Sequence, residues 1–224
     1  MLTGKNISED FFKKWSGDMA YVLGFFAADG NLSINKRGGC YISFQSKDKQ
    51  IIDDIKKAIG SSNKISKRSS KLTKRNFYRL QIGSKEIVEI LKKLGFHTSK
   101  TKHLPFPFLS SKILPHFVRG YFDGDGNIWK GEVHKERKTK LMVLQLVFTS
   151  GAYEFLNKLK ISLSEKLKTN GSHVVFKNGA YSRLQFSTID ALKIYNFMYN
   201  KGGSSLCLRR KKRQFDNYIK NMRL

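Results

Sequence analysis

Hydrophobic and polar positions along the chain follow one pattern that occurs twice. In the first half, an apolar stretch over residues 19–28 predicts a buried helix, and strict alternation over residues 41–45 predicts the returning strand of a hairpin. Isoleucines at helical spacing over residues 51–59 predict an amphipathic helix. A second hairpin is expected over residues 63–82 and a last helix over residues 87–94. The predicted order is therefore αββαββα.

The second half repeats this order with recognisable sequence. The segment LGFFAADGN at residues 23–31 recurs as RGYFDGDGN at residues 119–127, and RLQI at residues 79–82 recurs as RLQF at residues 183–186. The two offsets differ because residues 132–140 lengthen one hairpin of the second copy. Such self-similarity indicates a duplicated structural unit. The second copy's elements are expected at residues 117–124, 145–149, 155–163, 173–186 and 191–198.

The duplication sets the expected domain organisation. We expect an N-terminal repeat at residues 1–94, a linker at residues 95–112 and a C-terminal repeat at residues 113–224. The linker contains Pro-Phe-Pro at residues 105–107, which does not suit a helix interior. A chain of 224 residues has room for a hydrophobic core in each half. The predicted fold class is α+β, with two αββαββα repeats related by a pseudo-twofold axis.

Net charge indicates a polyanionic partner. The 43 Lys and Arg residues outnumber the 17 Asp and Glu residues, which gives a net charge of +26. An aromatic content of 12 % provides for a core and excludes a disordered basic tail. The chain up to Lys112 has 22 basic and 9 acidic residues and the remainder has 21 and 8, so each part carries +13. Nucleic acid is the expected partner, and no long basic amphipathic helix favours a membrane surface instead.

Two cysteines, Cys40 and Cys207, are too few for a disulfide framework or a four-cysteine zinc site. The five histidines have no zinc-ligand spacing, and no function is assigned to them. The first residues are not typical of a secretory leader. We therefore expect an intracellular protein, of a bacterial cytoplasm or of an organelle such as a mitochondrion or chloroplast, and not a secreted one.

The two apolar helices have small residues at a spacing of four and end in an acid. Gly24 and Ala28 in the first, like Gly120 and Gly124 in the second, leave a smooth stripe on which two helix backbones can approach closely. If the stripes face each other, the C-terminal ends bring Asp29 and Asp125 to one place. Gly30 and Gly126 follow the acids and are expected to adopt positive φ as the chain turns.

Paired carboxylates at helix C-termini predict a cation site. Each negative charge is unfavourable beside the C-terminal dipole, and two adjacent carboxylates repel each other. A hard divalent cation relieves both effects, because it prefers carboxylate, carbonyl and water oxygens. We expect Asp29 and Asp125 to bind it, with the last-turn carbonyls of Ala28 and Gly124 as further ligands. The plainer interpretation, that each Asp only caps a turn, applies to one Asp-Gly pair but explains the duplication poorly.

The motif at residues 117–126, FVRGYFDGDG, resembles the signature of the LAGLIDADG homing endonucleases in their single-chain, two-repeat form. The resemblance covers nearly the whole chain. The first copy departs from the commonest motif, because Ala27 stands where the second copy has Asp123. The family's catalytic acid is the penultimate motif residue, so this departure does not affect Asp29. Asp123 is then interpreted as a helix-end residue and not as a metal ligand.

The resemblance implies both a fold and a reaction. Antiparallel sheets of the two repeats would form a DNA-binding saddle on a monomer. The reaction would be hydrolysis of one phosphodiester in each strand of a long asymmetric DNA target, leaving 3′ overhangs, as in intron homing. The expected cofactor is Mg²⁺ or Mn²⁺, with Ca²⁺ as a substitute that does not support cleavage. Double-stranded DNA is the expected partner, and host intron RNA remains open as another.

Three further residues are candidates for the catalytic cleft. Lys100 and Lys211 stand where similar sequences carry a lysine near each scissile phosphate, and Gln45 is a candidate for orienting a water. For either lysine the alternative is a solvated or generic phosphate contact. For Gln45 the alternative is a base-reading or simply exposed position.

The strands explain recognition, because two-stranded ribbons fit the DNA major groove. Arg and Gln side chains suit guanine and adenine respectively. In the first half the expected DNA-binding residues are Asn31, Ser33, Asn35, Tyr41, Ser43, Gln45, Lys64, Arg68, Arg75, Arg79 and Gln81. In the second half they are Lys130, Lys135, Gln145, Lys177, Arg183 and Gln185. The two sets differ, so the target should be asymmetric.

Two other functions are compatible with the same scaffold, because fold does not fix function. One is an intron-encoded RNA maturase. The other is a non-catalytic DNA-binding regulator, against which the presence of both Asp29 and Asp125 argues. A nicking assay with Mg²⁺ distinguishes the three.

Overall fold

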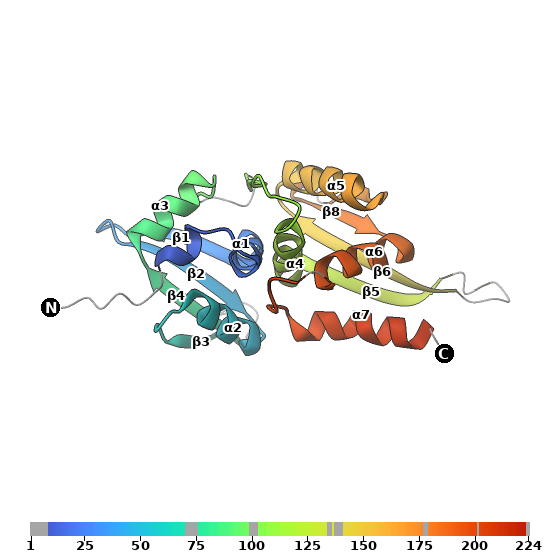
Figure 1. Ribbon diagram of the computed structural model, residues 1–224, viewed down its shortest axis with the longest axis horizontal. Helices are drawn as coiled ribbons and strands as arrows, with labels where there is room; N and C mark the ends of the chain where they lie inside the picture. Colours follow the sequence, from blue (N-terminus) through green and yellow to red (C-terminus); the bar gives the residue numbers. More distant parts are fainter. Residues whose placement is uncertain are drawn as a thin grey trace. The chain divides into compact units, whose positions relative to one another are not determined.

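A computed structural model describes residues 9–69, 76–98, 103–133, 136, 141–176, 179–200 and 202–222. The first half begins with a short 3₁₀ helix η1 and then has the predicted order αββαββα (Figure 1). Its elements are η1 (Glu9–Phe12), α1 (Gly17–Asp29), β1 (Gly30–Ile34), β2 (Cys40–Ser46), α2 (Lys49–Ile59), β3 (Ile65–Ser69), β4 (Asn76–Gly83) and α3 (Lys85–Lys93).

The second half has the same order and one further helix. Its elements are α4 (Leu114–Asp125), β5 (Gly126–Val133), β6 (Leu141–Ser150), α5 (Tyr153–Leu167), β7 (Ser172–Phe176), β8 (Tyr181–Phe186), α6 (Thr188–Tyr199) and α7 (Arg209–Met222). The α+β class and the repeated order are confirmed. Helix α7 was not predicted, although Lys211, Phe215 and Tyr218 are its buried residues and lie at helical spacing.

Each half contains a four-stranded antiparallel sheet, ordered β1-β2-β4-β3 in the first and β5-β6-β8-β7 in the second. In both sheets the two hairpins are joined through their second strands. Alternate residues fill the core: Ile42 and Phe44 of β2 are buried, as are Leu146 and Phe148 of β6. Helices α2 and α3 pack on the first sheet, and α5 and α6 on the second. Each sheet therefore has one face covered by helices, and its other face carries the alternate residues.

Local capping fixes several helix ends. The Ser16 hydroxyl accepts a hydrogen bond from the Met19 N–H at the start of α1, and the Ser84 hydroxyl accepts one from the Ile87 N–H at the start of α3. Helix α2 ends at Gly60, whose φ of 68° is the left-handed conformation that glycine adopts without strain. These signals lie in the local sequence, which is why the helix boundaries fall near the predicted ones.

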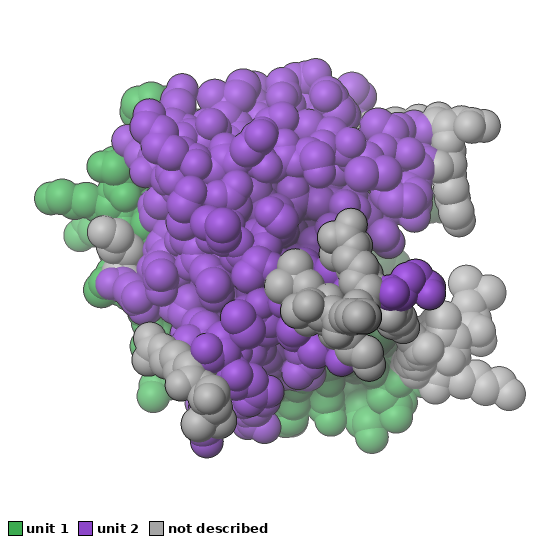
Figure 2. Space-filling model, turned by 90° about the vertical axis from the view of Figure 1, so that its right-hand side faces the viewer, with its two compact units in different colours: residues 1–100, 107–124, 202–208 green, residues 101–106, 125–201, 209–224 purple. Residues whose placement is uncertain are grey.

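The chain forms two compact units, coloured separately in Figure 2. Unit 1 contains residues 1–100, 107–124 and 202–208, and unit 2 contains residues 101–106, 125–201 and 209–224. The units do not follow the sequence repeats, because α4 up to Gly124 and the segment 202–208 cluster with the first half. Within the described ranges, no helix has the length and apolar character needed to cross a bilayer.

Candidate functional site

Helices α1 and α4 cross at backbone contact, as their small residues predict. A methyl group placed on Gly24 would lie 2.1 Å from the Phe117 carbonyl oxygen, and one placed on Gly120 would lie 2.0 Å from the Tyr21 carbonyl oxygen. Tyr21 and Phe117 occupy equivalent positions in the two repeats, so the contact is reciprocal. The predicted face-to-face stripes are thus confirmed, and only glycine fits at either position.

The contact between α1 and α4 extends to the C-terminal ends of both helices and determines the position of Asp29. A methyl group on Gly124 would lie 2.3 Å from Ala28 Cβ and 3.5 Å from Asp29 Oδ2. The half-buried Asp29 carboxylate therefore lies beside Gly124, the residue that directly precedes Asp125 in the chain. The backbone contact between the helices is what brings this acid to the last turn of α4.

The expected positive φ after the two acids is wrong, because neither Gly30 nor Gly126 has one. Gly30 has a φ of −77°, an ordinary extended conformation. Glycine is required for a different reason: a Cβ there would lie 2.2 Å from Phe26 Cδ2 and 2.5 Å from the Phe26 carbonyl oxygen. The Gly30 N–H donates to that carbonyl. The tight turn back over Phe26, and not the backbone angle, excludes a side chain at this position.

Asp125 ends α4 with an exposed side chain, and a buried lysine of the same unit contacts the residue that follows it. Lys211 on α7 is only 7 % exposed, and its Nζ donates a 2.6 Å hydrogen bond to the Gly126 carbonyl oxygen. Gly126 directly follows Asp125. The predicted cleft residue Lys211 is thus not a solvated surface lysine, because its ammonium is fixed beside the motif turn.

Helix α7, which carries Lys211, is anchored to α6. The Tyr195 hydroxyl donates to Asp216 Oδ1 at 2.5 Å, and the Tyr195 ring packs 4.9 Å from Phe215. Burial, together with the Asp216 carboxylate, raises the pKa of Tyr195 well above its ordinary value. Lys212 also pairs with Asp216, 3.0 Å from Oδ2. The partly buried contacts of Tyr195 hold the helix that presents the Lys211 ammonium, and the Lys212 pair lies at its surface.

One face of the first sheet carries most of the residues predicted to read DNA. Asn31 pairs with Ser43, and Ser43 with Gln81, so these side chains share a face. Ile42 and Phe44 lie on the opposite, helix-covered face. By register, the predicted residues on the polar face are Asn31, Ser33, Tyr41, Ser43, Gln45, Arg68, Arg79 and Gln81. Lys64 is exposed immediately before β3.

Two residues predicted to bind DNA are engaged in hydrogen bonds within the protein, one in the sheet and one in a turn. Ser43 is buried, 5 % exposed, and its hydroxyl accepts a 3.3 Å hydrogen bond from Arg79 Nη2. Asn35 lies in the turn after β1, where its Oδ1 accepts from the Arg37 and Gly39 N–H groups at 2.9 and 2.7 Å. The Ser43 hydroxyl therefore helps to orient the Arg79 guanidinium, and Asn35 stabilises the turn of the β1–β2 hairpin.

The corresponding face of the second sheet is more apolar. Gln145 and Gln185 lie on it and bond to each other, with Gln145 Nε2 donating to Gln185 Oε1 at 3.2 Å. Arg183 shares this face, because it pairs with Thr149. Trp129 pairs with Gln145 and is 45 % exposed, yet sequence reasoning did not single it out. The sequence signal that could have identified Trp129 was its position opposite Gln145, a predicted DNA contact, in the hairpin.

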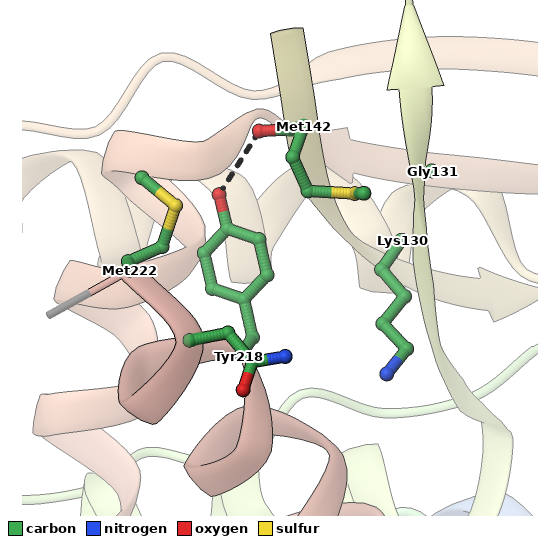
Figure 3. A pocket seen from close by; sticks show the side chains of 6 residues that line it. Lys130, Gly131, Met142, Tyr218 and Met222 are labelled. Carbon is green, nitrogen blue, oxygen red and sulfur yellow. Dashed lines mark hydrogen bonds between the residues drawn. The ribbon is translucent and has the colours of Figure 1, made fainter. Parts of the chain in front are cut away.

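Lys130 lies on the other face of β5, away from Gln145. It pairs with the buried Leu144, and it lines a pocket of about 360 Å³ together with Met142 and Tyr218 (Figure 3). The Tyr218 hydroxyl donates to the Met142 carbonyl oxygen at 3.2 Å on the wall of this pocket. A one-residue change in register moves a side chain to the opposite face, which is why its place was missed. Lys100, Arg75, Lys135 and Lys177 lie outside the described residues.

Solved structures with this architecture cover most of the chain. The homing endonuclease I-LtrWI bound to target DNA superposes with a TM-score of 0.63 at 14 % identity, over 96 % of this chain and 92 % of that one. I-WcaI bound to its DNA recognition sequence gives 0.59 at 19 % identity, over 93 % and 94 %. The meganuclease I-AabMI bound to uncleaved DNA gives 0.60 at 16 %, over 91 % and 90 %.

A family model described as LAGLIDADG-like domain matches residues 16–95, which include α1 and the first sheet. The chain has the LAGLIDADG homing endonuclease fold. The resemblance expected from the motif is confirmed, and α1 and α4, which carry the two copies of that motif, are called the LAGLIDADG helices.

Curated relatives are much longer than this chain. The replication factor C small subunit of Methanocaldococcus jannaschii is 25 % identical over 171 residues, which is 75 % of this chain and 9 % of that protein. The DNA-directed RNA polymerase subunit Rpo1C of the same organism is 25 % identical over 193 residues, 81 % of this chain and 20 % of the relative. The chain thus spans a small part of these relatives. They are named for different activities, so neither name transfers to it.

The second LAGLIDADG helix also holds a later segment of the chain. Arg119 is 2 % exposed, and its guanidinium donates to the carbonyl oxygens of Leu206 and Ser204 at 2.8 and 3.0 Å. Asp123 is equally buried, and its Oδ2 accepts from the Tyr21 hydroxyl at 2.6 Å and from the Leu208 N–H at 2.7 Å. Asp123 is therefore a structural residue that fastens residues 204–208 to both LAGLIDADG helices, and the role of Arg119 was missed.

His116 near the start of α4 is expected to make stability depend on pH. It is 1 % exposed, and burial, followed by the Arg119 charge, lowers its pKa below the ordinary 6.5. The unfolded chain then binds more protons than the folded one below about pH 6.5, so the free energy of unfolding should fall as pH falls through that range. Urea unfolding at pH 7.5 and 5.5 should show a smaller loss for His116→Gln than for the wild type. Equal losses in the two proteins would contradict this role. His173 also has a lowered pKa, but it is present in both proteins and cannot cause a difference between them.

Each of the two helix ends, taken by itself, offers a carboxylate of the kind that binds magnesium. Among the residues that the structure describes, no group of three or more His, Cys, Asp and Glu side chains could hold a metal ion. Mg²⁺ does not require such a cage, because it keeps several waters and is bound by one or two carboxylates together with substrate phosphates. Asp29, beside Gly124, and Asp125, exposed at the end of α4, offer carboxylates of that kind.

Proposed function

We propose that this chain is a site-specific, Mg²⁺-dependent double-strand DNA endonuclease that hydrolyses one phosphodiester in each strand of a long asymmetric target and leaves 3′ overhangs. The observation that supports this most directly is the reciprocal crossing at Gly24 and Gly120, which places the Asp29 carboxylate beside the residue preceding Asp125. A fold that only bound DNA would have no need of two acids at this crossing, since carboxylates repel phosphates.

The two acids and their neighbouring carbonyls are the proposed metal ligands. Asp29 and Asp125 would hold Mg²⁺, with the carbonyl oxygens of Ala28 and Gly124 available as further ligands. When bound, the ion would activate water and neutralise charge on the attacking and leaving oxygens of the displacement. In the free protein, the Gly24 and Gly120 contacts fix the helix ends, so the Asp29 carboxylate is in place before DNA arrives.

Lys211 is proposed to stabilise the negative charge that develops on the scissile phosphate near Asp125. Its ammonium lies at the Gly126 carbonyl and is fixed by burial, so it needs little reorganisation to donate to a phosphate oxygen. Lys211→Met should slow cleavage about 100-fold, the typical effect of one transition-state donor. Nicked DNA should accumulate, because one strand depends on this residue.

The matched control is Lys212→Met on the same helix. Lys212 is partly exposed and paired with Asp216, so its loss should change the cleavage rate less than about threefold, as for a surface ion pair. The measurement is single-turnover cleavage of a supercoiled plasmid that carries the site, with nicked and linear products followed separately. Equal effects of the two substitutions would contradict the role of Lys211.

The polar faces of the two sheets are the proposed DNA-reading surfaces, and their different residues predict unlike half-sites. The first face offers Gln45, Arg79 and Gln81 in register, whereas the second offers Trp129 and the Gln145–Gln185 pair. Hydrogen-bond donors on a ribbon suit the edges of bases in the major groove. An asymmetric target follows, because the faces share an Arg and a Gln at equivalent positions but differ in the residues around them.

The test begins with a library of random-sequence DNA duplexes, from which the protein selects its site in the presence of Ca²⁺. The selected duplex is then incubated with Mg²⁺, with Mn²⁺ and with Ca²⁺, and the ends are mapped on each strand. We expect cleavage of both strands with Mg²⁺ or Mn²⁺, with 3′ overhangs, and binding alone with Ca²⁺. Selection of a site that is never cut would favour a DNA-binding regulator, and failure to select any DNA would overturn the proposal.

A further inference from the structure

Two arginines in equivalent positions of the repeats are supported by different chemistry. Arg79 in β4 corresponds to Arg183 in β8, at the same offset that relates Ser43 to Val147. Arg79 Nη2 donates to the Ser43 hydroxyl at 3.3 Å. Val147 has no hydroxyl and is 5 % exposed, so it cannot hold Arg183 in the same way. If Arg183 has a fixed orientation, other side chains of the second repeat must hold it.

The aromatic rings of Phe176 and Tyr181 lie close enough to Arg183 to hold it. The Arg183 guanidinium carbon lies 4.7 Å from the centroid of the Phe176 ring and 5.8 Å from that of Tyr181. These rings are themselves stacked, 5.1 Å apart with an interplanar angle of 8°. Phe176 and Tyr181 are directly opposite each other in the β7–β8 pair, and Arg183 is two residues beyond Tyr181 on the same face. All three side chains are half-buried, so the cluster remains open to a ligand.

An arginine held against an aromatic ring keeps N–H donors that a hydrogen bond would use. The five N–H donors of a guanidinium lie in its plane, so a ring against its flat side holds it without using any of them. Arg79, in contrast, already has one Nη2 donor directed at Ser43. An arginine that is oriented by aromatic rings and keeps all its donors can make the bidentate contact that guanine offers through O6 and N7.

We propose that Phe176 and Tyr181 are positioning residues that orient Arg183 to recognise one guanine in the half-site contacted by the second sheet. This inference rests on the proposed DNA-reading function. The two rings do not contribute a base contact of their own in this scheme. They lower the conformational freedom that Arg183 would otherwise lose on binding, and so raise discrimination at a single base pair.

The experiment uses the duplex that the wild-type chain selects from the random-sequence library, with a panel of all single-base variants, and measures binding in Ca²⁺. Arg183→Ala first identifies the base pair that depends on Arg183. Phe176→Leu, which keeps apolar bulk but removes the ring, should then reduce discrimination at that pair about three- to fivefold, the size of a partly exposed cation–π contact. Discrimination elsewhere should be unchanged, and Phe176→Tyr should restore it.

A double substitution distinguishes the positioning role of the rings from a purely structural one. On the Arg183→Ala background, Phe176→Leu should have no further effect at that base pair, because the residue it positions is absent. Phe77→Leu is the control in the first repeat: Phe77 corresponds to Tyr181 and pairs with Arg68, so its substitution should leave this pair unaffected. If Phe176→Leu does not fold, Tyr181→Leu takes its place with the same expectation.

Two outcomes would overturn the inference while leaving the proposed function standing. One is uniform weakening across the whole panel for Phe176→Leu. The other is an equal loss on the wild-type and Arg183→Ala backgrounds. Failure of the wild-type chain to select any duplex would instead overturn the proposed function, and the positioning role with it. A selected duplex with discrimination lost at one base pair supports both.

Discussion

Replacing either Asp29 or Asp125 by Asn is expected to abolish double-strand cleavage while site-specific binding stays within about tenfold of the wild type, because binding depends mainly on contacts of the sheets with bases and phosphates. Asn preserves the shape of the side chain but removes the charge that a divalent cation requires. Both acids are expected to be needed, since each is proposed to serve one strand. The measurement is cleavage of the selected duplex in Mg²⁺, with binding measured separately in Ca²⁺.

Asp53→Asn is the control for the loss of a carboxylate as such. Asp53 is on α2, and its exposed carboxylate pairs with Lys49 at 2.7 Å. Its substitution should change neither cleavage nor binding beyond about twofold, as expected for a surface ion pair. If either motif variant still cut both strands at a near-normal rate, the two-acid site would be refuted.

Gly120→Leu is expected to lower the free energy of unfolding by about 3 kcal/mol or more, at or above the upper end of the range for overpacked cores. The atoms that a new side chain meets are backbone: the Tyr21 carbonyl oxygen lies 2.0 Å and the Phe25 nitrogen 2.9 Å from the position of its Cβ. Rotation of a side chain cannot relieve such a clash, so the helices must separate. Urea denaturation followed by circular dichroism measures the loss.

Gly202→Leu provides a matched control for the same substitution. No atom lies within 4 Å of a Cβ placed at Gly202, so the added side chain meets open space. Its effect should stay within about 0.5 kcal/mol, as is usual for surface substitutions. A Gly120→Leu variant as stable as the Gly202→Leu variant would show that α1 and α4 do not pack as described.

Much of the fold could be predicted because its determinants are local and occur twice. The alternation in β2 and the isoleucines of α2 specify which face is buried, and Gly24 with Gly120 specify where two helices can touch. The duplication made each prediction testable against its copy. The polar face of the first sheet, which we propose reads DNA, followed from the same alternation, since Asn31 and Gln81 lie on it with Ser43 between them.

The errors concern contacts that the pattern of polar and apolar residues does not reveal. Lys130 was assigned to the reading face, but its pairing with Leu144 places it on the helix side. Gly30 was expected to supply a positive φ, whereas Phe26 is what excludes a side chain there. Helix α7 was not predicted, because five charged residues at its start conceal the stripe of Phe215 and Tyr218.

The sequence by itself determined the repeated αββαββα order, the buried stripes and the two acids that end the LAGLIDADG helices, because period, charge and glycine spacing are properties of neighbouring residues. Only the tertiary structure decided that Lys211 is buried at the Gly126 carbonyl and that Arg119 and Asp123 fasten residues 204–208. A basic or acidic residue has the same signature in sequence whether it is solvated or buried. Its partner, supplied by a segment some 85 residues away along the chain, is what sets its role.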